Sequence, residues 1–97
     1  MTQLDAPTTT IAARSLRLHP SVALRPEPFG ALAYHYDTRR LVFLKHPTLV
    51  DLVRRLEHHD SVADAMTAAD IPADRRDDYE SAIRSLLDSE MLDDQAG

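Results

Sequence analysis

The hydrophobic pattern of this chain changes its period at Pro47, and this change limits the possible folds more than any other feature. In residues 31–36, larger apolar or aromatic side chains alternate with small or polar ones, as in a strand with two different faces. After Pro47 the apolar side chains recur at helical spacing, at Leu49, Leu52, Val53 and Leu56. Strands and helices that occupy separate halves of a chain predict an α+β domain rather than alternating βαβ units.

Three strands are expected over residues 21–25, 31–36 and 40–44, forming an antiparallel meander. Pro26 and Pro28 are expected to end the first strand, since proline disrupts central-strand pairing. Three helices are expected to follow, over residues 47–59, 61–69 and 73–89. This order predicts a winged-helix-like layout, with a three-stranded antiparallel sheet followed by three helices.

The 97 residues are enough for one domain, which we place at residues 16–93. Residues 1–15 are polar and threonine-rich, and they are expected to form a disordered tail, with Ile11–Ala13 as the one apolar run able to dock. Residues 94–97 are expected to be a disordered C-terminus. The chain has no secretory signal pattern and no apolar run of about 20 residues, so a cytoplasmic setting is expected.

Residue types that carry chemistry are absent or badly spaced. The chain has no cysteine, which excludes thiolate zinc sites, iron–sulfur clusters and cysteine nucleophiles. Its five histidines lie in separate segments or are adjacent on a helix, so no metal site is expected. Only Gly30 and Gly97 are present, which rules out a phosphate-binding glycine loop. We therefore expect no catalytic residues and no cofactor, and the chain is not predicted to be an enzyme.

The charge distribution argues against a nucleic acid as the partner. Residues 1–59 carry eight cations against five acids, while residues 60–97 carry three cations against eleven acids. The predicted third helix holds Arg75, Arg76 and Arg84 among five acidic residues. A net-negative helix would be repelled by the phosphates of either groove.

The predicted third strand, residues 40–44, is apolar on both faces and would end one edge of a meander. It has no proline or inward-pointing charge to block further pairing, and cations flank both of its ends. Such an edge suits an extended peptide that adds to the sheet as another strand. The alternative is that the helices and the N-terminal segment bury both faces of the strand.

The segments 16–36 and 39–45 resemble the mycofactocin-system precursor-peptide binding chaperones. These belong to the PqqD-like group, the recognition elements of ribosomally made and modified peptides. The resemblance extends over residues 16–93, and the blocks 25–36 and 39–45 carry it most specifically. Residues 37–38 lack the glycine expected of such relatives, so the conformation of that turn is left open.

The resemblance implies a PqqD-type fold that holds the leader of a mycofactocin precursor peptide between the third strand and the third helix. It also implies delivery of that peptide to a radical S-adenosylmethionine (radical SAM) maturase, which carries its own iron–sulfur clusters. The implied peptide-binding residues on the strand are Arg39, Arg40, Leu41, Val42, Phe43, Leu44 and Lys45. Those on the helix are Arg76, Tyr79, Ile83 and Leu87. The alternative function is a winged-helix adaptor that binds a folded protein through its acidic helices.

Overall fold

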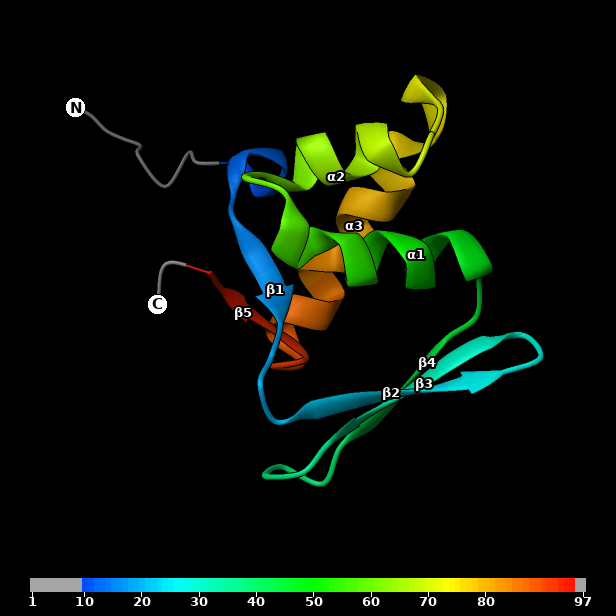
Figure 1. Ribbon diagram of the computed structural model, residues 1–97, viewed down its shortest axis with the longest axis vertical. Coiled ribbons are helices and arrows are strands. Elements are labelled where there is room, and N and C mark those ends of the chain that lie inside the picture. Colours follow the sequence, from blue (N-terminus) through cyan, green and yellow to red (C-terminus); the bar gives the residue numbers. More distant parts are fainter. Residues whose placement is uncertain (1–9, 96–97) are drawn as a thin grey trace.

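The structure is a computed structural model that describes residues 10–95, with helices packed on one side of a three-stranded sheet (Figure 1). The strands are β1 (Leu16–Leu18), β2 (Val22–Glu27), β3 (Gly30–His35), β4 (Leu41–Leu44) and β5 (Leu92–Asp94). The helices are α1 (Pro47–Arg55), α2 (Val62–Ala68) and α3 (Arg76–Asp88). Short 3₁₀ helices are η2 (Ile11–Ala13), η3 (Leu56–His58) and η4 (Ala73–Arg75).

The predicted meander and the three helices are confirmed. The strand order in the larger sheet is β2-β3-β4, with both pairs antiparallel. The predicted apolar stripe of α1 is buried, because Leu49, Leu52 and Val53 all face the core. No helix in the described range is long and apolar enough to cross a membrane.

The expected end of the first strand at Arg25 is wrong, because β2 continues through Pro26 to Glu27. The amide of Tyr36 donates to the carbonyl of Ser21 at 2.8 Å, which makes this pair a hydrogen-bonded one. Hydrogen-bonded pairs alternate along an antiparallel ladder, so Pro26, opposite Ala31, falls at a pair that exchanges no bonds. Proline is tolerated there, since β2 is an edge strand and its missing N–H would have pointed to solvent.

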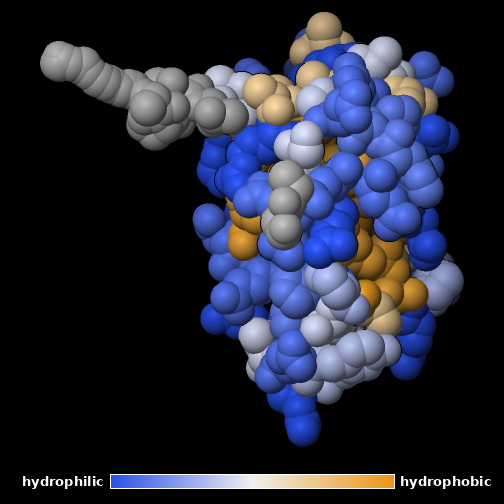
Figure 2. Space-filling model, turned by 60° about the vertical axis from the view of Figure 1, so that its left-hand side comes forward, coloured by the Kyte–Doolittle hydropathy of each residue, from blue (hydrophilic) through white to orange (hydrophobic). Residues whose placement is uncertain are grey.

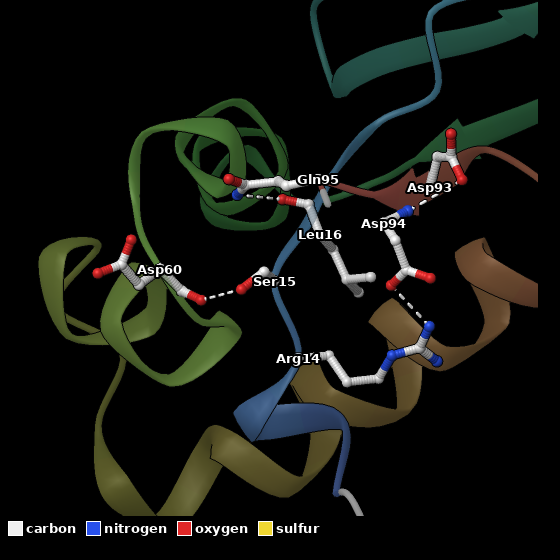
Figure 3. Close-up of polar contacts among 7 residues, drawn as sticks. All are labelled: Arg14, Ser15, Leu16, Asp60, Asp93, Asp94 and Gln95. Atoms are coloured by element: carbon white, nitrogen blue, oxygen red, sulfur yellow. Dashed lines mark hydrogen bonds and ion pairs between the residues drawn. The ribbon is translucent and has the colours of Figure 1, made fainter. Parts of the chain in front are cut away.

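The two short strands β1 and β5, which the sequence pattern did not predict, bring the two ends of the described chain together (Figure 3). Leu16 lies opposite Asp94, and Leu18 lies opposite Leu92. The guanidinium of Arg14 donates to the carboxylate of Asp94 at 2.8 Å, as Figure 3 shows. A three-residue strand is too short for a period of two to be recognised in sequence.

The expected boundaries of the domain need correction as a result. Ile11 is 5% exposed and belongs to the core, and the hydroxyl of Ser15 donates to the carbonyl of Asp60 (Figure 3). Asp94 and Gln95 are likewise part of the packed structure. Residues 10–15 and 94–95 therefore belong to the domain, while residues 1–9 and 96–97 of the expected tails lie outside the described range.

The side chain of Gln95 connects three segments of the fold. Its Nε2 lies 2.8 Å from the carbonyl oxygen of Leu16, 2.6 Å from that of Leu56 and 2.9 Å from that of His59. We expect Gln95→Ala to lower the free energy of unfolding by about 1–3 kcal/mol, since it leaves buried carbonyls without a donor. Thermal unfolding followed by circular dichroism measures the effect. Gln95→Glu, which keeps the size but loses the donor, should be at least as destabilised, and an unchanged Tm in both variants would contradict this role.

The exterior of the molecule is mostly hydrophilic on the face that Figure 2 shows. Strong hydrophobic colour on that face gathers mainly in one area, low on the right-hand side of the view. On this face, strongly hydrophobic surface is therefore local.

Candidate functional site

The turn between β2 and β3 brings the end of β4 close to β3. Gly30 follows the two turn residues Pro28 and Phe29 and has a φ of +154°. A Cβ atom on Gly30 would lie 2.0 Å from the carbonyl oxygen of Leu44. Only glycine allows β4 to approach this closely, so Gly30 sets the position of Leu44 against β3.

The turn between β3 and β4 is held by a buried histidine. The Nδ1 of His35 accepts hydrogen bonds from the amides of Asp37 and Thr38, each at 3.2 Å. His35 is only 3% exposed, and the centroid of its ring lies 4.6 Å from the centroid of the His19 ring. Arg39 takes the left-handed conformation, with a φ of +65°, that a glycine would have adopted more readily. The turn therefore closes without glycine because the histidine fixes its backbone.

The free edge of β4 presents the main-chain groups of alternate residues. The amide of His35 donates to the carbonyl of Arg40 at 3.0 Å, so this is a hydrogen-bonded pair. By alternation, Val42 and Leu44 bond to β3, whereas the N–H and C=O groups of Leu41 and Phe43 point away from the sheet. Within residues 10–95, no other strand pairs with that side of β4. The edge is open over the length of the strand.

The side chains of β4 divide between two faces. Leu44 is 2% exposed and Val42 is partly buried, and both pack against the core below the helices. Leu41 and Phe43 are 57% and 56% exposed on the opposite face. Within residues 10–95, no element buries the face that carries Leu41 and Phe43, and the rest of the N-terminal segment named in the alternative lies outside the described range.

A groove runs along the open edge between β4 and α3. It contains a pocket of about 170 Å³ whose lining combines apolar side chains with two serines. The lining residues are Val42, Phe43, Leu44, Leu49, Ala82, Ser85, Leu86 and Ser89. Ala82, Ser85, Leu86 and Ser89 have the spacing of one helical stripe, and three of them are small. The small side chains leave space between the helix and the strand.

The helix residues expected to line the groove lie on a neighbouring stripe of α3. Ile83 has no exposed surface, and Tyr79 and Leu87 pack against the core. Arg76 turns toward the end of α2, where it donates to the carbonyl of Ile71 at 3.3 Å and to the hydroxyl of Thr67 at 3.1 Å. These four residues are therefore not gathered at the groove pocket, because the apolar stripe of α3 packs into the core. The stripe of small residues beside it was the signal that sequence reasoning missed.

Three cations flank the open edge. Arg39 and Arg40 lie before β4, and Lys45 follows it. All three are exposed, and no carboxylate of the described residues lies within 4 Å of them as an ion-pair partner. They attract negative charge to both ends of the strand.

The arrangement has features that suit the binding of an extended chain. Open main-chain donors and acceptors lie beside a pocket with room for an apolar side chain, which are the two requirements of strand addition. Among residues 10–95, no group of three or more histidine, aspartate or glutamate side chains is placed to hold a metal ion.

Comparison with known proteins agrees with this geometry. The model of the Peptide chaperone MftB family matches residues 15–93. A peptide chaperone MftB from Mycolicibacterium smegmatis is 47% identical over 78 residues, covering 80% of this chain and 76% of that protein. Proteins of the same name from Mycobacterium ulcerans and Mycobacterium tuberculosis are 47% and 44% identical, each over 81% of this chain and 72% of the relative. No solved structure matches the chain significantly.

Proposed function

Since the chain belongs to the Peptide chaperone MftB family, we propose that it binds the leader of a ribosomally made precursor peptide by strand addition at β4. The leader extends the sheet as a strand beside β4, and the chaperone delivers it to the radical SAM maturase of mycofactocin biosynthesis. The chaperone itself performs no chemistry. The sequence resemblance in residues 16–36 and 39–45 supports the mycofactocin pathway in particular.

The observation that carries this proposal is the open edge of β4 beside a groove. A peptide that pairs there bonds to the N–H and C=O groups of Leu41 and Phe43. Every second side chain of the peptide then points into the groove toward α3. The pocket of about 170 Å³ is close to the size of engineered apolar cavities that hold one benzene, so it accepts one medium apolar side chain.

Filling the pocket tests this arrangement. Ser85 is exposed at the rim of the groove, so Ser85→Trp should fold normally and occupy the space meant for the peptide side chain. The probe is a synthetic leader peptide of a mycofactocin precursor, titrated by isothermal calorimetry. We expect at least about tenfold weaker binding, because the apolar contact of a side chain is worth about 1.5–3 kcal/mol.

The matched control is Ser81→Trp, since Ser81 is also exposed on α3 but does not line the pocket. It should bind the leader as the parent does. If both tryptophan variants bind equally well, the leader does not enter this groove. If the parent protein ignores the isolated leader, the adaptor function through the acidic helices becomes the better account.

The cations at the start of β4 should contribute through charge. Arg39→Glu combined with Arg40→Glu is expected to weaken leader binding and to reduce its dependence on salt, because two attractive charges become repulsive. The measurement is the affinity at about 50 mM and 500 mM NaCl. Arg54→Glu with Arg84→Glu is the control, since both arginines are exposed and neither belongs to β4 or lines the groove pocket. Equal losses in the two double variants would mean that net charge alone is responsible.

A further inference from the structure

The large apolar side chains that are most exposed in residues 10–95 lie together on the larger sheet. Phe29, Tyr36, Leu41 and Phe43 are 41%, 58%, 57% and 56% exposed. None of the helices contributes a large apolar residue of comparable exposure within the described range. We call these four residues, which lie on or beside the side of the sheet away from the helices, the outer face. Several large apolar side chains exposed together are typical of an interaction site.

The aromatic rings of the outer face contact one another or a neighbouring ring of β3. The rings of Phe29 and Phe43 meet edge to face with centroids 5.7 Å apart. The rings of Tyr34 and Tyr36 are also edge to face, at 5.3 Å. Such preordered aromatic surfaces lose little conformational entropy when a partner covers them. The outer face therefore has the properties of a binding surface and not only of an incompletely covered sheet.

A leader bound at the edge of β4 covers only part of this surface. A strand added beside β4 places its side chains next to those of Leu41 and Phe43, its cross-strand neighbours. Phe29 and Tyr36 lie in the turns at the two ends of β3, which spans about 20 Å for its six residues. Neither turn residue lies on β4, so the outer face offers contacts to a second occupant beside the leader.

The charges around the outer face indicate the chemistry of that occupant. A pocket of about 360 Å³ opens between Phe29, Phe43 and Lys45, so an apolar side chain that enters it meets a cation at the rim. Arg39 and Arg40 lie at the other end of the strand. A second copy of the chain docked through the same face would bring these cations against their own equivalents. The partner instead has an apolar contact surface with carboxylates at its margin.

We propose that the outer face docks the enzyme that receives the leader, through an apolar surface rimmed by acidic residues. This inference rests on the proposed function and assigns the enzyme a surface that adjoins the leader site at β4. β4 takes part in both contacts, with its edge toward the leader and the side chains of Leu41 and Phe43 toward the enzyme. The bound leader then lies one strand spacing, about 4.8 Å, from the strand that the enzyme contacts.

The test uses the full chain with Phe29→Asp and Tyr36→Asp, separately and together. Both side chains are more than 40% exposed and neither lines the groove beside α3. We expect leader affinity to stay within about twofold of the parent. Binding of the leader-loaded variants to the purified radical SAM maturase, measured by biolayer interferometry, should fall by at least about thirtyfold in the double variant. Ala73→Asp is the control. Ala73 is exposed in η4, so this substitution should change neither the leader affinity nor the maturase affinity.

Several results would overturn the inference. Full maturase binding by the folded double variant would exclude the outer face, as would a failure of the leader-loaded parent to bind the maturase. Loss of leader affinity in these variants would make the outer face part of the leader site. If the parent forms dimers in sedimentation velocity and Phe29→Asp abolishes them, the outer face is a self-interface.

If the aspartate variants fail to fold, Phe29→Ser and Tyr36→Ser answer the same question without adding charge. A parent that binds no leader refutes the proposed function instead.

Discussion

Leu41→Pro is expected to weaken leader binding by about tenfold to a hundredfold while the domain stays folded. The N–H of Leu41 points away from β3, so its loss breaks no bond of the sheet but removes a donor that the leader uses. A buried acceptor left without its donor costs about 1–3 kcal/mol, which gives the expected range. The measurement is calorimetric titration with the synthetic leader, together with thermal unfolding to verify the fold.

Two control variants separate the main-chain effect from other causes. Leu41→Ala removes the same side chain but keeps the N–H, so it should lose little leader affinity. Val42→Pro removes an N–H that bonds to β3 and should destabilise the sheet itself, by about 3 kcal/mol. If a folded Leu41→Pro protein binds the leader as tightly as the parent does, strand addition at β4 is refuted.

Gly30→Ala is expected to destabilise the protein by about 3 kcal/mol or more. The added Cβ would lie 2.0 Å from the carbonyl oxygen of Leu44 and 3.1 Å from its carbonyl carbon, so β4 has to move away from β3. The φ of +154° adds backbone strain for any residue with a side chain. Because Leu44 lines the groove pocket, the same change should also weaken leader binding. Chemical denaturation and the leader titration measure the two effects.

Pro28→Ala is the matched control, because Pro28 lies in the same turn and is exposed. Its change in unfolding free energy should stay within about 0.5 kcal/mol, as is usual for exposed positions. A Gly30→Ala protein with the stability and affinity of the parent would show that β4 does not depend on its close approach to Gly30.

Much of the architecture follows from local pattern. The period of two in residues 31–36 and the stripe of Leu49, Leu52 and Val53 correctly predicted β3 and α1. β1 and β5 could not be predicted, because three residues carry no recognisable period and their pairing joins positions almost eighty residues apart. The folded state of residues 10–15 was missed for the same reason, since Ile11 is buried only by elements far along the chain.

The candidate site was predictable on one side only. The strand 41–44 was recognised as a possible open edge from its composition, and within residues 10–95 no further strand pairs with it. For the wall formed by α3, the apolar residues Tyr79, Ile83 and Leu87 were expected to face the groove. In the structure they pack in or against the core, and the pocket is lined by Ala82 and Ser85.

The sequence by itself determined the order of strands and helices, the strand with apolar residues on both faces, and the absence of cysteine chemistry. These are local properties, because side-chain spacing and residue type act within a few positions along the chain. Only the tertiary structure decided that the main-chain groups of Leu41 and Phe43 are the free ones and that the small stripe of α3 faces β4. Register and helix rotation arise from the simultaneous packing of several elements, so no single segment encodes them.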